Sequence, residues 1–149
     1  MSKNVTVQID TRKLNDIIKK LPGNRDKAIR AIAFSIERKA KVNCTKLQLV
    51  DTGALRASIY TRTSRGSFVN GREITGLPEL PERADPNLPR ETLPTVRDGE
   101  AVIGPSVEYG IYHEFGARRV RSRPFLGPAV NSTAKELEEH LKDVCTGGE

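Results

Sequence analysis

Residues 24–47 read NRDKAIRAIAFSIERKAKVNCTKL and hold the clearest periodic pattern in the chain. Apolar side chains recur there at steps of three and four residues, from Ile29 through Ile36 to Leu47, which is the stripe of an amphipathic helix. At about 1.5 Å per residue, roughly 24 residues make a rod of about 36 Å. A helix of that length is expected to span the whole body of a small domain or to project from it.

The outer face of this helix is basic. Its charged residues are the cations Arg25, Lys27, Arg30, Arg38, Lys39, Lys41 and Lys46 and the acids Asp26 and Glu37. Such a face is either a solvated helix surface or an electropositive docking strip, and the sequence leaves both interpretations open. The formal net charge of the chain, +6, permits contact with a nucleic acid or an acidic protein surface and selects neither.

The length of 149 residues corresponds to about one domain, so we expect residues 1–149 to form a single one. No apolar run of about 18 residues is present, which argues against a membrane span. The first residues lack the apolar core of a signal peptide. Cys44 and Cys145 lie far apart and fit neither a disulfide framework nor a zinc site. These features favour a cytosolic protein that does not contact membranes.

Shorter patterns flank the long helix. Residues 5–9 alternate apolar and polar side chains, which predicts a strand, and residues 11–21 predict a short helix. After the long helix, Asp51 and Thr52 are expected to cap a helical turn at 54–58, followed by a strand at 59–63.

The second half of the chain carries its own local signals. Asp98-Gly99 lies between two β-prone segments and predicts a hairpin over 95–103. Residues 107–115 predict a short helix, with Phe115 on its apolar stripe, and Pro128 suits the first turn of a last helix. Together these elements predict an α+β fold: a small, mostly antiparallel sheet packed against one long and two or three shorter helices.

Residues 64–94 differ in composition from the rest. They hold five of the nine prolines and several glycines, and no helical or strand period is visible there. We therefore expect an extended Pro/Gly-rich assembly loop within the single domain, since this segment is too polar to build a core of its own.

Motifs of catalysis are incomplete. His113-Glu114 has no second histidine four residues further on, so the zinc-protease geometry cannot form. Ser58 and Ser106 lack the glycine pattern of a nucleophile elbow, and Cys44 lies on the apolar stripe of the long helix, as a core thiol does. We expect no enzyme activity, no metal and no cofactor.

Three segments together resemble a family. Residues 51–59, DTGALRASI, resemble its DTGxLRxSI box; residues 107–116, VEYGIYHEFG, resemble its YaxYxExG box; and residues 123–129, RPFLGPA, resemble its RPFLxPA box. The family comprises minor tail components of long-tailed bacteriophages, described as tail-completion or head–tail joining (neck) proteins. The three boxes occur in the family's order, and the resemblance covers about two thirds of the chain. The Pro-rich segment is longer than the family pattern.

The resemblance implies a structural virion protein. Such a subunit forms a ring of six copies at the head-proximal end of the tail. Its partners would be further copies of itself, a connector or head-completion protein on one side, and the tail-tube or tail-terminator protein on the other, with DNA passing through the channel. Assembly takes place in the host cytoplasm and the product resides in the neck of the virion.

The boxes also supply the candidate contact residues. We expect Arg56 to lie exposed or to pair with Glu114, which could equally face Arg123, because the guanidinium fork matches a carboxylate. Phe125 is either a core plug or a knob inserted into a neighbouring subunit. Tyr109 and Tyr112 are of a type enriched at interfaces. The remaining interface candidates are Arg38, Lys41, Asp51, Arg118, Arg119 and Arg121.

An alternative function uses the same cations. The cluster Arg118, Arg119, Arg121 and Arg123, with the lysines of the long helix, could grip phosphates. In that case the protein would be a basic nucleic-acid-binding accessory protein. Only three Tyr and four Phe are present, which gives little capacity for stacking on bases.

Overall fold

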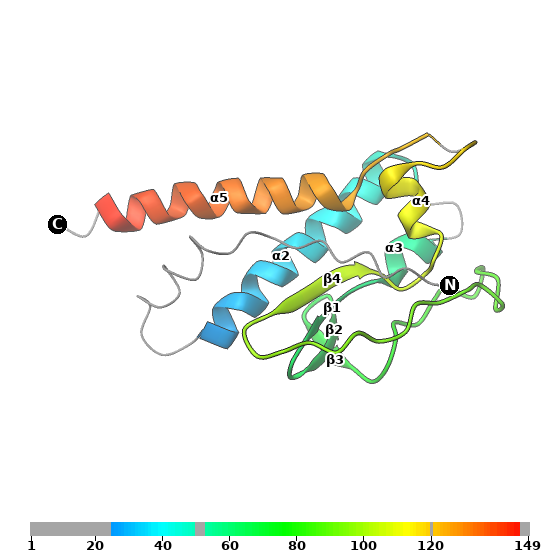
Figure 1. The fold of residues 1–149 in the computed structure, drawn as a ribbon, viewed down its shortest axis with the longest axis horizontal. Helices are drawn as coiled ribbons and strands as arrows, with labels where there is room; N and C mark the ends of the chain where they lie inside the picture. Colours follow the sequence, from blue (N-terminus) through cyan, green and yellow to red (C-terminus); the bar gives the residue numbers. More distant parts are fainter. Residues whose placement is uncertain (1–24, 50–52, 120, 147–149) are drawn as a thin grey trace.

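The computed structural model describes residues 25–49, 53–119 and 121–146, with side chains described from residue 28 to residue 137. The expected strand at 5–9, the expected helix at 11–21 and the expected cap at Asp51 and Thr52 lie outside these residues. Figure 1 shows the arrangement of the elements.

Eight helices and strands make up the described part of the chain. In chain order they are α2 (Arg25–Lys46), α3 (Ala54–Ser58), β1 (Ile59–Thr63), β2 (Gly66–Val69), β3 (Arg72–Ile74), β4 (Ala101–Pro105), α4 (Gly110–Phe115) and α5 (Leu126–Thr146). The expected α+β fold is confirmed. The predictions for α2, α3, β1 and α5 are also confirmed.

The sheet has four antiparallel strands in the order β3-β2-β1-β4. Helix α2 lies across one face of the sheet, against β1 and β4, and α5 packs across α2 on the side away from the strands (Figure 1). The core lies where these elements meet, and its fully buried side chains include Ile36, Cys44, Leu55, Ile59 and Phe125. The apolar stripe predicted for residues 24–47 is therefore the stripe that faces the core.

The expectation of no strand in residues 64–94 is wrong, because β2 and β3 form a hairpin there. Asn70 and Gly71 connect the two strands with φ of 52° and 81°. Positive φ at both central residues is the requirement of a type I′ turn, which Asn-Gly meets better than almost any other pair. The dipeptide is a local hairpin signal inside a segment whose prolines and glycines suggested a loop.

The end of the Pro-rich segment, residues 91–94, lies against the second face of the sheet. Tyr60 and Arg62 of β1 point to that face, and the Arg62 Nε donates to the Pro94 carbonyl at 2.6 Å. The Arg90 guanidinium donates to the Pro78 carbonyl and to Ser106 Oγ, each at 2.7 Å. Residues 75–94 are thus tied to the domain by side-chain cations that reach backbone carbonyls.

The hairpin expected around Asp98-Gly99 is only half present. The turn exists and β4 follows it, but residues 91–97 form no strand. Pro94 has no N–H to donate and its carbonyl is held by Arg62, so the segment crosses under the sheet instead of pairing along β4. Strand β4 therefore lies at the edge of the sheet.

Candidate functional site

Glu114 is the central residue of the box segments. It lies on α4, is 9% exposed, and accepts three backbone hydrogen bonds. The N–H groups of Phe125 and Leu126 donate to Oε2, both at 2.9 Å, and the N–H of Gly127 donates to Oε1 at 2.7 Å. The glutamate of the second box thus binds the backbone of the third.

The three donors stand at the beginning of α5, which explains the contact physically. The first N–H groups of a helix have no partner inside the helix. They also carry the positive end of the helix dipole, so a carboxylate is favoured there. Glu114 acts as an N-terminal cap supplied by another helix, and we call this contact the Glu114 clamp.

Two glycines of the boxes allow the close packing around this clamp. A Cβ on Gly127 would lie 3.1 Å from the Glu114 Oε1. A Cβ on Gly110 would lie 2.6 Å from Cγ of Pro105 and 3.2 Å from Cδ1 of Leu55. The start of α4 therefore touches both the end of β4 and the first box, and all three box segments meet in one cluster. Helix α4 begins three residues later than predicted, because Val107 instead forms a β-bridge with Arg90.

Both partners expected for Glu114 are wrong. The Arg56 Nη1 donates to Thr45 Oγ1 at 3.1 Å, and the Arg123 Nη1 donates to the Leu47 carbonyl at 3.2 Å. Both arginines are exposed, and their guanidinium groups lie at the surface near the end of α2. The backbone donors reach the carboxylate from inside, where it is shielded from water. Backbone N–H groups exist at every residue except proline, so no sequence signal marked these three.

The sequence left two alternatives for Phe125, a core plug or a knob for a neighbouring subunit, and the structure shows the core plug. Its side chain is fully buried, and its carbonyl accepts a hydrogen bond from the Asn43 Nδ2 at 3.0 Å. That bond joins the last turns of α2 to the beginning of α5. Phe125 is therefore unavailable as a knob for another subunit.

The aromatic residues of α4 divide into two kinds. Tyr109, just before the helix, packs against the core and meets His113 edge to face, with ring centroids 5.7 Å apart. Tyr112 is 52% exposed and Phe115 is 62% exposed. Phe115 was expected on the buried stripe. The two exposed rings are three residues apart and so share one face of the helix.

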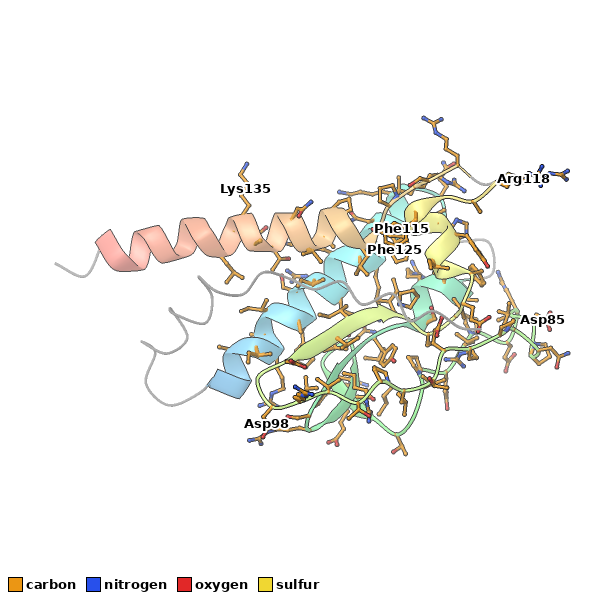
Figure 2. All side chains as sticks on the ribbon, in the orientation of Figure 1. Asp85, Asp98, Phe115, Arg118, Phe125 and Lys135 are labelled. Carbon is orange, nitrogen blue, oxygen red and sulfur yellow. The ribbon has the colours of Figure 1, made fainter. Side chains whose placement is uncertain are left out.

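A basic arm, residues 117–119 and 121–124, lies between α4 and α5 in the chain. Its four arginines are all exposed: Arg118, Arg119, Arg121 and Arg123. Two hydrogen bonds hold the end of the arm against α4. The Arg123 N–H donates to the His113 carbonyl at 2.7 Å, and Ser122 Oγ donates to the Glu114 carbonyl at 2.9 Å. Figure 2 shows Arg118 extending away from the body of the protein.

The basic face of α2 is less free than the sequence suggested. The Lys41 ammonium lies 3.1 Å from Glu37 Oε2 and donates to Asn70 Oδ1 at 2.9 Å. The Lys39 ammonium lies 2.7 Å from Glu136 of α5. Lys41 therefore belongs to the fold and not to a docking strip. Arg38 is exposed. Asp51, also expected at an interface, lies outside the described residues.

Among the described residues, no group of three His, Cys, Asp or Glu could hold a metal ion. Burial raises the pKa of the Cys44 thiol to about 12, and the charge of Glu114 adds to this while Arg56 opposes it. At neutral pH this thiol is protonated and a poor nucleophile. Burial and the charge of Arg123 lower the pKa of His113.

Comparison with known proteins adds no relative. The chain matches no family model, no curated protein and no solved structure. Among the described residues, no helix has the length and apolar character needed to cross a bilayer.

Proposed function

We propose that this protein is a structural subunit of the neck of a long-tailed bacteriophage, where it completes the tail and joins it to the head. It would form a ring of copies at the head-proximal end of the tail, contacting a connector protein and the tail tube or its terminator. It would assemble in the host cytoplasm and remain in the virion. The Glu114 clamp is the observation that supports this proposal most strongly.

The clamp matters because it gives the resemblance a physical meaning. Glu114 and Gly127 belong to different boxes, and each is required by the other: the carboxylate caps α5, and the missing side chain makes room for it. The close packing of Gly110 against Pro105 and against Leu55 of the first box likewise leaves no room for a side chain. Three boxes that resemble one family thus form one packed unit in this chain.

The surface beside this unit has the character of a contact surface. Tyr112 and Phe115 expose aromatic rings next to the basic arm, although aromatic side chains are usually buried. Aromatic and arginine residues are the types enriched in protein interfaces. A subunit that completes its surface by binding neighbours accounts for both.

The assembly test uses purified chain mixed with isolated tail tubes. Native mass spectrometry and negative-stain microscopy should detect rings of the chain or its binding at one end of the tubes. A matched variant, Tyr112→Ser with Phe115→Ser, should bind tube ends about tenfold more weakly if these two aromatic side chains anchor the contact. If the wild-type chain neither assembles into ring-shaped oligomers nor binds tube ends, the result counts against the proposal.

A second candidate function is nucleic-acid binding, which the four exposed arginines of the basic arm favour. A salt titration of duplex DNA binding separates the two. Binding of submicromolar strength at physiological salt, lost on replacing the arm arginines, would support it. Weak association seen at low salt alone is what a merely basic surface gives.

A further inference from the structure

A groove with a cavity of about 100 Å³ opens on the side of α4 that faces the sheet. Residues 102–105 of β4 form one wall and Glu91, Thr92 and Pro94 form another, and α4 contributes Ile111 and Phe115. Phe125 and Leu126, both buried, close the bottom. We call this the β4 groove.

The charged side chains that line the β4 groove are all acidic. They are Glu91, Glu108 and Glu114, and no lysine, arginine or histidine lines it. Glu114 is saturated by its three N–H donors, but Oε2 of Glu91 is buried and has no hydrogen-bond partner among the described residues. Burial raises the pKa of Glu91, and the nearby charge of Glu108 raises it further. Besides Glu114, which caps α5, the groove thus holds two carboxylates, Glu91 and Glu108, that form no ion pair with a described cation.

Arg62 and Arg90 donate their hydrogen bonds to groups other than the carboxylates of the groove. Arg62 donates to the Pro94 carbonyl and to Ser67 Oγ, and Arg90 donates to the Pro78 carbonyl and to Ser106 Oγ. These guanidinium groups hold residues 75–94 on the sheet and do not line the groove. A cation supplied from outside would therefore improve the electrostatic balance of the groove.

The wall formed by β4 adds a backbone feature. Because β4 is an edge strand, one side of it carries N–H and C=O groups that do not pair with another strand. An extended segment can bind such an edge through its main chain while its side chains enter neighbouring pockets. The groove is thus suited to an extended, basic segment.

The chain itself carries such a segment. The basic arm has four arginines, and no acidic residue occurs from 116 to 135. Residues 121–124 are without helix or strand, and no described acid forms an ion pair with the arm. The arm is basic and the groove is acidic, and no described residue of the arm lines the groove.

We propose that the β4 groove of one copy receives the basic arm of a second copy, head to tail. Two different surfaces on each chain make this contact heterologous, and a heterologous contact closes into a ring when the rotation between copies allows it. The inference rests on the proposed function, for which it names the contact between neighbouring subunits.

The first experiment tests the contact without requiring a ring. A fluorescent peptide copying residues 116–125 is titrated onto the full chain at low and at physiological salt. We expect saturable binding that weakens by about tenfold when Glu91→Gln and Glu108→Gln are combined. The matched control combines Glu82→Gln and Glu100→Gln, which change the net charge equally but do not line the groove.

Two results would overturn the inference. One is the absence of saturable binding by the peptide. The other is equal affinity for the groove variant and its control, since general charge attraction would then explain the binding. Circular dichroism of each variant shows whether the fold is kept, and the glutamine replacements are nearly isosteric.

A charge exchange distinguishes this inference from the proposed function. One variant reverses the groove with Glu108→Arg, and the other reverses the arm with Arg118→Glu and Arg119→Glu. Each alone should lose self-association on tail ends, while a mixture of the two should recover it, because every arm then meets a groove of opposite charge.

If each variant alone assembles like the wild type, the contact is wrong although the subunit function stands. If the wild-type chain neither forms rings nor binds tail ends but the peptide binds as expected, the proposed function fails and the contact stands. If the peptide does not bind and the arm variant alone loses duplex DNA, the arm serves a nucleic acid.

Discussion

Two buried glutamates, Glu37 and Glu114, each connect two elements of the fold, and their negative charges are balanced in different ways. Glu37 of α2 is 1% exposed, and it accepts hydrogen bonds from Thr61 Oγ1 at 2.9 Å and from the Asn70 N–H at 2.8 Å. The Lys41 ammonium lies 3.1 Å from the same carboxylate. Glu114 has three backbone N–H donors and no ion pair with a described cation.

The two carboxylates therefore depend on different parts of the protein for the balance of their charge. Glu37 ties α2 to the sheet through the Thr61 side chain and the Asn70 N–H, and a nearby lysine, Lys41, supplies the opposite charge. Glu114 ties α4 to α5 through the backbone, so the beginning of a helix supplies it. The Glu37 contact therefore depends on a second side chain, whereas the Glu114 clamp depends on α5 being formed. The basic arm connects the two helices that this clamp joins.

The largest effect is expected from Glu114→Ala. It leaves three N–H groups at the start of α5 without their acceptor, and we expect a loss of about 3 kcal/mol in the free energy of unfolding. Urea denaturation measures it, with Glu100→Ala on an exposed turn as the control. Glu114→Gln should lose less, because its amide oxygen still accepts. A loss below about 1 kcal/mol for Glu114→Ala would mean that the clamp does not stabilise the fold.

A smaller effect is expected from Lys41→Met. The change removes the cation beside Glu37 but leaves both hydrogen-bond donors, so we expect a loss of about 1–2 kcal/mol. In a double-mutant cycle with Glu37→Gln the two losses should not add, since each removes the same ion pair. Additive losses, or a loss for Lys41→Met as large as that for Glu114→Ala, would contradict the distinction between the two carboxylates.

Sequence patterns predicted the elements whose signals are local. The apolar stripe of residues 24–47 predicted α2, and the β-branched residues at 59–63 predicted β1. Two hairpin signals had opposite outcomes: Asn70-Gly71 makes a hairpin and was overlooked, while Asp98-Gly99 was used and lacks its first strand. The reason lies in Arg62, whose bond to the Pro94 carbonyl holds the preceding segment under the sheet. Such a contact between distant residues leaves no local pattern.

The candidate site was predictable in its members and not in its contacts. Glu114 and Phe125 were named from the sequence, but the partner of Glu114 was expected to be an arginine. A carboxylate near two arginines suggests an ion pair, whereas the true donors are main-chain groups that no residue type reveals. The exposure of Phe115 was also missed, because its spacing from Ile111 fits a buried stripe equally well.

Gly127→Ala tests the packing of the clamp. A helical glycine replaced by alanine usually gains about 0.5–1 kcal/mol. Here the new Cβ would lie 3.1 Å from the Glu114 Oε1, so we expect a loss of about 0.5–1 kcal/mol instead. In the Glu114→Ala background the same change should become stabilising. An equal effect in both backgrounds, measured by urea denaturation, would show that the two residues do not restrict each other.

The smallest effect concerns Cys44, beside the clamp. Its pKa is raised from an ordinary value of 9.0 to about 12. The stability gained by burying a neutral thiol is complete below pH 9 and is lost as the pH rises from about 9 toward 12, because the unfolded chain ionises first. Alkylation of Cys44 in a Cys145→Ser background should be slow at pH 8 and fast in urea. Rapid alkylation of the folded chain would contradict the burial.

Joining of heads to tails tests whether this chain is a neck subunit. Phage particles are produced without this chain, and the purified protein is then added to their separated heads and tails. We expect infectious particles to form only after wild-type protein is added, and Glu114→Ala to restore far fewer. Heads and tails that join normally without the chain would show that it is not a neck subunit.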